Sequence, residues 1–287
     1  MVRFGHLNPP EKKFRAPSHK RERDPQPVAE AYCAAVGFGD GVESSNIVGY
    51  QQIDLAKGFS FFTATFKDCN QETIDIQKIT SVQATGAAWK TSGSGSTKCA
   101  GNITIQKIGT NGAYLDEYLY YSTKTPQGWY DANGTYVAAG EVTLANGEGL
   151  VINNTHQVGA KLVVNGEVDL VPARVLPKGF SFCGNFTPVT IDLQDIMSTQ
   201  ADGTAWKTSG SGSTKCAGNI TIQKIGTNGA YLDEYLYYST KTPQGWYDAT
   251  GTYVQAGTVN FVPGEGFVVN MTHQVGARLV LPNPVAE

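Results

Sequence analysis

Charged residues are scarce in this 287-residue sequence, and positive charge is not in excess. Asp, Glu, Lys and Arg make up 16% of the chain, well below the roughly 25% of an average soluble domain. The 22 basic residues face 25 acidic ones, which gives a net charge of −3. Binding to a phosphate backbone needs a surplus of positive potential. We therefore expect no nucleic-acid partner.

Long apolar runs and long amphipathic helical patterns are missing as well. No stretch approaches the ~18 consecutive apolar residues of a membrane helix, so we expect no membrane span. The sequence does hold many turn formers, with 33 glycines and 13 prolines, and 40% of its residues are hydrophobic. Frequent turns, little charge and enough apolar material for a core indicate an all-β protein.

One long sequence occurs twice in the chain. Residues 88–132 reappear unchanged as residues 205–249, a run of 45 residues at an offset of 117. Weaker matching extends the repeat in both directions, which predicts a first module over 47–166 and a second module over 167–287, each of ordinary domain size. Because the identity includes loop residues, which packing does not demand, we interpret the second module as a recent duplicate of the first.

Residues 1–46 differ from the rest of the chain. The first 27 residues hold seven basic and three acidic side chains, several prolines and few apolar residues, which predicts a disordered basic arm. Residues 29–35 resemble the cleavage end of a secretory signal, but charged residues replace the apolar stretch that must precede it. We thus predict no signal peptide in the sequence as given. The chain is either cytoplasmic, or exported with its true start elsewhere.

Strand patterns fill both modules. Apolar and polar residues alternate over 102–108, and the Asn-Gly pair that follows is a strong hairpin signal. The return strand is expected over 113–121, and the same hairpin recurs at 219–238. Further strands are predicted over 47–55, 59–66, 135–144, 150–153 and 160–164. Six to eight short strands in each module predict two tandem β-sandwiches or small barrels.

The acidic pairs do not have the geometry of a glycosidase site. Asp116 and Glu117 are adjacent, as are their copies Asp233 and Glu234. Neighbours on a strand point to opposite faces, whereas glycosidases need two carboxylates that face one substrate.

Histidine is rare outside the arm. His156 and His273, one in each module, have no Cys, Asp or Glu at a metal-ligand or triad spacing. We interpret both as turn residues and keep a binding role as the alternative. We accordingly predict no enzymatic activity, no metal and no cofactor.

Cysteines leave the redox state open. Each module has two, Cys69 with Cys99 and Cys183 with Cys216, which favours intramodule disulfides and an oxidising compartment. However, Cys99 and Cys216 occupy equivalent positions in the repeat, whereas Cys69 and Cys183 do not. Because a disulfide tolerates a narrow range of Cα separations, four reduced thiols are the alternative.

Aromatic residues carry the clearest binding signal. An exposed ring can stack on a sugar or anchor a protein partner, although core packing and cross-strand pairs are the alternative. Two consecutive tyrosines on a strand must place one ring outward. The candidate binding residues are Trp129, Tyr130, Tyr121, Trp246, Tyr247 and Tyr238, together with His156 and His273.

Four short motifs resemble a loosely defined family of uncharacterised, exported bacterial β-repeat proteins. They are Ser45-Asn-Ile-Val-Gly-Tyr50, the Lys-Gly-Phe-Ser-Phe strand, Gly128-Trp-Tyr-Asp131 and Gly264-Glu-Gly-Phe-Val-Val-Asn270. The resemblance spans both modules. It implies a secreted or cell-surface setting and assigns no catalytic residues.

The leading hypothesis is a non-enzymatic extracellular or cell-surface protein with a structural or adhesive role. Two linked weak sites gain avidity without any new contact, which a repeated binding module exploits. The partners would be glycans or other surface proteins, and self-assembly stays open. The first alternative is a tandem carbohydrate-binding protein that uses exposed Trp and Tyr platforms. The second is a hydrolase with its site at the module interface.

Overall fold

A computed structural model describes residues 2–5, 47–69, 71–92, 98–109, 113–156, 158–208, 215–226, 231–272 and 275–285. His273 and most of the predicted disordered arm lie outside these residues. One part of the arm differs from the prediction, because Val2–Gly5 forms a strand, β1, that pairs antiparallel with β2 (Val48–Leu55).

The first module is a β-sandwich of two antiparallel sheets. One sheet has the order β1-β2-β11-β5, and the other has the order β3-β10-β6-β7-β8. Two further short strands pair with each other: β4, which lies between β3 and β5 in the sequence, and β9, which lies between β8 and β10. The bounds not yet given are β3 (Gly58–Thr63), β4 (Thr73–Asp75), β5 (Ile79–Gln83), β6 (Ala100–Ile108), β7 (Tyr114–Tyr121), β8 (Gly128–Asp131), β9 (Thr143–Ala145), β10 (Gly149–Asn154) and β11 (Ala160–Glu167).

The second module repeats this arrangement with a smaller first sheet. Its sheets have the orders β12-β21-β15 and β13-β20-β16-β17-β18, and β14 pairs with β19. The bounds are β12 (Ala173–Leu176), β13 (Gly179–Gly184), β14 (Ile191–Asp192), β15 (Met197–Gln200), β16 (Ala217–Ile225), β17 (Tyr231–Tyr238), β18 (Gly245–Asp248), β19 (Asn260–Phe261), β20 (Gly266–Met271) and β21 (Ala277–Val280).

The all-β prediction is confirmed. Helical structure in the described residues is limited to two 3-10 turns, η1 (Ile76–Lys78) and η2 (Leu193–Asp195), and no described helix could span a membrane. The sheets stay open, so the architecture is a sandwich rather than a barrel. The predicted pairing of β6 with β7 is confirmed, with Ile103 and Ile105 buried, while the Asn-Gly pair between the strands lies outside the described residues.

Buried side chains form two hydrophobic clusters. The first runs from Ile47 to Val168, and the second from Leu176 to Leu281. Val168 packs in the first cluster although it follows the predicted boundary at residue 166. The identical runs fold alike, since β6 and β16 have the same burial pattern, residue for residue, as do β7 and β17.

The strand predicted over 135–144 is wrong. Only β9, at its end, is extended within a sheet, and the residues before it form turns. The amide of Glu141 donates to the carbonyl of Ala138 at 3.0 Å, and Gly140 has a φ of +80°, a left-handed conformation that breaks a strand. High β propensity at Thr135, Tyr136 and Val137 does not outweigh this turn.

A glutamine side chain fastens β8 to the core. Gln77 in η1 donates from Nε2 to the carbonyls of Trp129 and Val137, and its Oε1 accepts from the amide of Trp129 at 3.1 Å. Gln194 makes the same three bonds in the second module. Each amide thus ties the 3-10 turn to β8 or β18 and to the segment that follows it.

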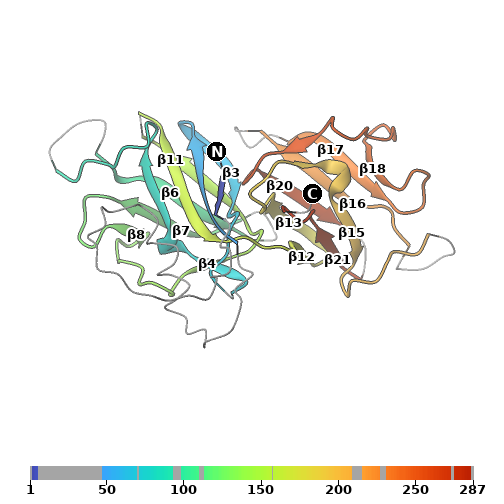
Figure 1. Cartoon of the computed structure of the whole chain (residues 1–287), viewed down its shortest axis with the longest axis horizontal. Helices are drawn as coiled ribbons and strands as arrows, with labels where there is room; N and C mark the ends of the chain where they lie inside the picture. Colours follow the sequence, from blue (N-terminus) through green and yellow to red (C-terminus); the bar gives the residue numbers. More distant parts are fainter. Residues whose placement is uncertain are drawn as a thin grey trace, which may run out of the picture.

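The two modules lie side by side along the longest axis, with β3 close to β13 and β20 (Figure 1). The amide of Thr63 in β3 donates to the carbonyl of Gly264 at 3.0 Å, and Phe62 and Glu265 form an isolated bridge. Gln51 adds a side-chain bond to the carbonyl of Pro263 at 3.2 Å. Backbone hydrogen bonds therefore cross between the modules.

Glycines make this contact close. A Cβ at Gly149 would lie 2.6 Å from the carbonyl carbon of Phe182, and one at Gly266 would lie 2.9 Å from the Cβ of Phe61. The two glycines are equivalent in the repeat, as are the two phenylalanines. The contact is thus nearly two-fold symmetric, and it has no room for side chains at the glycines.

The glycine contact predicts a strong effect of added volume. We expect Gly149→Val combined with Gly266→Val to lower the free energy of unfolding by about 2–3 kcal/mol, because backbone atoms of the opposite module must shift. Urea denaturation measures this change. The matched control adds the same residue at exposed, equivalent turns, Ala132→Val with Ala249→Val, and should stay within about 0.5 kcal/mol of the parent. Equal effects of the two pairs would contradict the close contact.

Candidate functional site

The two candidate tryptophans are not surface platforms. Trp129 and Trp246 are 0% exposed, and each Nε1 donates to a backbone carbonyl, Ile79 in the first module and Ile196 in the second. The prediction that these rings are exposed is therefore wrong. The reason is their position on β8 and β18, where they face the core and pack edge-to-face on Tyr120 and Tyr237.

In the first module, the candidate tyrosines Tyr121 and Tyr130 hold a lysine of the same chain between their rings, and we call this cluster the lysine–tyrosine clamp. Lys124 Nζ lies 4.0 Å from the ring centroids of both Tyr121 and Tyr130, and Tyr136 packs edge-to-face on Tyr130. The hydroxyl of Tyr130 also donates to the carbonyl of Pro126 at 2.6 Å. Cation–π contacts of this kind fix the 122–127 loop. Tyr130 is buried and Tyr121 half-buried, which leaves little ring surface for a ligand.

The second module builds the same clamp. Lys241 lies 4.0 Å from the centroids of Tyr238 and Tyr247, and Tyr253 packs on Tyr247. The alternative of cross-strand aromatic packing thus describes these tyrosines better than a sugar platform does.

His156 is a structural residue. It is buried, its ring lies 4.4 Å from that of Trp89, and Nδ1 accepts from the amide of Val158. Nε2 is therefore the protonated nitrogen, and it donates to the carbonyl of Lys98 at 3.1 Å. Both nitrogens are engaged within the fold, so the binding role considered for His156 is not supported. His273 lies outside the described residues.

The predicted disulfides are not formed. Cys69, Cys99, Cys183 and Cys216 are all reduced. Cys99 and Cys216 donate from Sγ to the carbonyls of Tyr120 and Tyr237 inside their cores, and Cys183 is buried as well. Cys69, in contrast, lies in a half-buried loop. The alternative of four reduced thiols is correct.

Other apolar side chains are exposed at equivalent positions in both modules. Tyr114 and Leu115 at the start of β7 are 58% and 63% exposed, and Tyr231 and Leu232 at the start of β17 are 58% and 62% exposed. Phe59 on β3 and Phe180 on β13 are exposed as well. Sequence reasoning placed these residues in strands without singling them out, although the repeat of Tyr-Leu beside an Asn-Gly turn was visible.

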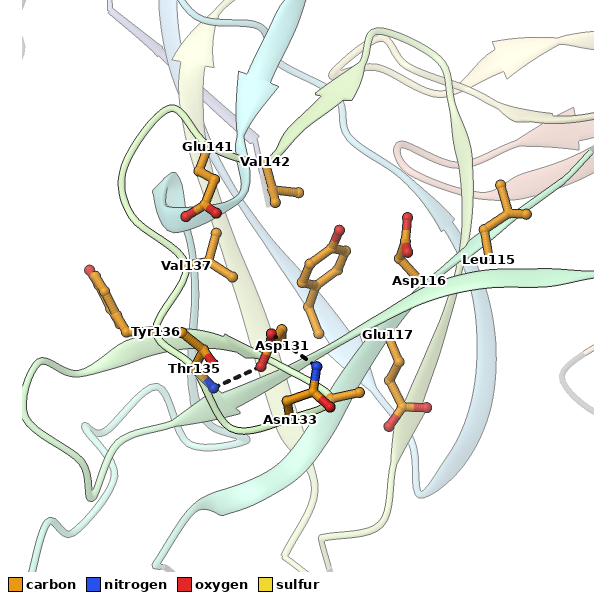
Figure 2. Close-up of a pocket in the computed structure, with 12 residues that line it drawn as sticks. Leu115, Asp116, Glu117, Asp131, Asn133, Thr135, Tyr136, Val137, Glu141 and Val142 are labelled. Atoms are coloured by element: carbon orange, nitrogen blue, oxygen red, sulfur yellow. Dashed lines mark hydrogen bonds between the residues drawn. The ribbon is translucent and has the colours of Figure 1, made fainter.

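A pocket of about 370 Å³ lies beside the exposed part of β7 in the first module (Figure 2). It is bounded by β7, the end of β8 and the loop over 131–142. Figure 2 shows Asp116 and Glu141 coming from different walls, β7 and the loop. Asp131 accepts from the amide of Thr135 at 2.7 Å, which holds the β8 end of the pocket in its turn.

The carboxylates of Asp116 and Glu117 have different surroundings, as expected for neighbours on a strand. Glu117 accepts from Gln106 Nε2 of β6 at 2.7 Å, whereas Asp116 lies near Tyr118. Burial raises the pKa of the Tyr118 hydroxyl, and the negative charges of Asp116, Asp131, Glu141 and Glu148 raise it further. The same tyrosine therefore stays protonated at neutral pH and lies in a negative field.

Comparison with protein-family models, with curated proteins and with solved structures found no match. The function must accordingly be argued from the residues themselves. Within the described part of the chain, no three His, Cys, Asp or Glu side chains gather in an arrangement that could hold a metal ion.

The thiols predict a selective chemical reactivity. Burial raises the pKa of Cys99, Cys183 and Cys216, and because thiolate is the reactive form, these thiols should react slowly in the native protein. In a Cys33→Ser background at pH 8, we expect one thiol, Cys69, to react rapidly with a disulfide reagent, and all four after addition of urea.

Two results would contradict this assignment. Fewer than four thiols in urea without reductant would indicate a disulfide. Rapid reaction of three or four thiols in the native protein would show that the buried thiols are accessible.

Proposed function

We propose that this chain is a non-enzymatic surface protein with an adhesive or structural role, in which one rigid two-module body presents two equivalent attachment surfaces. An extracellular or cell-surface setting is part of the proposal. It rests on the resemblance to exported β-repeat proteins, and the reduced thiols add no support for it.

The repeated exposure of large apolar side chains carries the proposal. Tyr114 and Leu115, and their equivalents Tyr231 and Leu232, are each more than half exposed. A large apolar side chain gains nothing from contact with water, and clustered exposed ones mark interaction sites. Because they lie in the duplicated run, both modules present the same exposed pair, which gives the chain two copies of one surface.

Rigidity supports a two-site mode of attachment. The backbone contact at Gly149 and Gly266 holds the modules in one relative orientation, so that the two surfaces keep a constant separation. Binding at the first site then places the second site near its own target without loss of orientational freedom. Two weak sites on one body can thereby give durable attachment.

A second candidate is a tandem carbohydrate-binding protein, and one observation favours it. The outer face of the five-stranded sheet carries Phe59, Asn153 and Thr104 in one cross-strand row, and Phe180, Asn270 and Thr221 repeat this row. Each row places an exposed ring beside an amide, the combination that stacks on and hydrogen-bonds to a sugar. The Oγ1 atoms of Thr104 and Thr221 are buried without a hydrogen-bond partner in the described structure.

The third candidate, a hydrolase with its site between the modules, gains no such support. The described contact between the modules is made mainly by glycines, backbone groups and apolar side chains such as Phe61, Phe62 and Phe182, with Gln51 bonded to the carbonyl of Pro263. The ring of His156 is engaged by Trp89, Val158 and Lys98 instead.

Retention of the labelled full chain on intact cells of the organism that encodes it tests the proposal. The cells come from a strain that lacks the gene, so that the cells' own copies of the protein do not occupy the binding surface. We expect Tyr114→Ser with Leu115→Ser to weaken retention about tenfold or more, and the further change of Tyr231→Ser and Leu232→Ser to abolish it, because avidity multiplies two weak affinities. Flow cytometry over a concentration series measures the effect.

The control removes exposed apolar side chains that are not repeated. Val171→Ser combined with Val262→Ser deletes two such residues and should leave retention unchanged. Retention that survives the fourfold variant would overturn the adhesive proposal. If retention instead depends on Phe59 and Phe180 and is blocked by a soluble oligosaccharide, the carbohydrate-binding candidate is correct.

A further inference from the structure

The edge of β7 is only partly covered. Strand β8 pairs with Tyr118 to Tyr121 and ends at Asp131, so that it leaves Tyr114 to Glu117 without a partner on that side in the described structure. On its other side β7 pairs with β6, with an irregularity between Glu117 and Tyr114, where Leu115 and Asp116 have no register partner. An uncovered strand edge presents backbone donors and acceptors that an extended peptide can join.

The pocket lies directly against this uncovered edge. Leu115 and Asp116 of the edge are among its walls, and the loop over 131–142 forms the opposite side (Figure 2). The lining includes the carboxylates of Asp116, Asp131 and Glu141 and contains no lysine or arginine. A strand added to β7 would therefore place its side chains against a negatively charged wall.

Tyr118 gives an independent indication of a ligand. Its side chain is 9% exposed and lines the pocket, and its hydroxyl has no hydrogen-bond partner in the described structure but is open to the pocket rather than fully buried. Buried hydroxyls normally have such a partner. Tyr120, two residues later, meets this rule, because its hydroxyl accepts from Gln127 Nε2 at 2.7 Å. The Tyr118 hydroxyl is thus left for a donor or acceptor that enters the pocket.

We infer that this pocket binds a basic, extended peptide segment of a partner protein, which pairs with the free edge of β7 and places an arginine or lysine side chain between Asp116, Glu141 and Tyr118. The inference rests on the proposed adhesive function and names the partner chemistry of the same surface, since Tyr114 and Leu115 flank the pocket. Carboxylates supply the charge, and the tyrosine ring and hydroxyl supply a cation–π face and a hydrogen bond.

The second module offers a natural comparison. Asp233, Tyr235 and Asp248 repeat three of the pocket residues, but Thr258 stands where the first module has Glu141. Tyr235 is buried to the same degree as Tyr118, and the negative charges near it are those of Asp233 and Asp248 alone. The inference therefore predicts that the first module binds a basic peptide more tightly than the second.

Glu141 can be exchanged without loss of its turn. Its carboxylate accepts from the amide of Ala138 at 2.9 Å, while in the second module the Thr258 hydroxyl donates to the carbonyl of Gln255 at 2.6 Å. Each side chain thus ties the same turn. Glu141→Thr and Thr258→Glu are consequently matched substitutions, each of which installs a residue that the equivalent turn already carries.

The test uses a fluorescent octapeptide of alternating arginine and valine with the full-length protein at low salt. We expect saturable binding, about threefold weaker affinity after Glu141→Thr, as for the loss of one exposed ion pair, and about threefold tighter binding at the second module after Thr258→Glu. A photo-crosslinking version of the peptide, mapped by mass spectrometry, should label residues 113–142. The glutamate analogue and a backbone N-methylated analogue should both bind at least about tenfold more weakly.

Several results would overturn the inference. These are crosslinks outside both pockets, equal affinity of the parent and Glu141→Thr, no gain from Thr258→Glu, or full binding of the N-methylated peptide. Displacement of the peptide from this pocket by a neutral oligosaccharide would assign the pocket to a sugar instead. Cell retention that is lost with Tyr114 and Leu115 but unaffected by Glu141→Thr would refute the basic partner and leave the adhesive function intact.

Discussion

The backbone contact between the two five-stranded sheets fixes the position of every other surface in this protein. Gly149 and Gly266 let β10 and β20 approach the opposite module so closely that a methyl group would collide with its backbone or with a Cβ. Backbone hydrogen bonds between the modules at this distance favour a single relative orientation of the two modules. Two sandwiches with separate hydrophobic clusters thereby behave as a single body.

Two surfaces follow from this constraint. The β6–β7 and β16–β17 hairpins carry exposed Tyr-Leu pairs at equivalent positions, and the near two-fold contact relates one to the other. Stability comes from the buried tryptophans, the glutamine bonds to β8 and β18 and the lysine–tyrosine clamps, all of which lie inside the modules. The hairpins pack their middle parts into the two cores, whereas Tyr114, Leu115 and their equivalents stay exposed, so these exposed ends can contact a partner without loss of fold.

Local sequence patterns predicted much of the fold. Alternation of isoleucines in β6 and the following Asn-Gly turn define a hairpin from short-range chemistry alone. The strand expected over 135–144 failed because a left-handed glycine at position 140 and a turn bond from Glu141 decide that segment, and neither is visible in β propensity. Alternation correctly says that Trp129 and Tyr130 face opposite sides, but both are buried, because Lys124 and Tyr136 cover the ring of Tyr130.

The candidate site was less accessible to sequence reasoning. Asp116, Asp131 and Glu141 lie on three successive segments and converge only when β7, β8 and the loop assemble. The sequence feature that comes nearest to marking this pocket is the difference between Glu141 and its equivalent Thr258 in an otherwise similar repeat. That difference can be interpreted only when the position of Glu141 in the pocket is known. Packing decides between intramodule disulfides and reduced thiols, because Cys99 and Cys216 are buried in their cores while Cys69 lies in a loop.

The distance between the two modules in solution tests the central claim most directly. Spin labels at Ala138→Cys and Gln255→Cys, two exposed and equivalent turn positions, report this distance by pulsed electron resonance in a background without Cys33 and Cys69. A rigid two-module body predicts one narrow distance distribution, which broadens when Gly149→Val and Gly266→Val are added. A broad distribution in the parent protein would show that the modules move independently and would contradict the account.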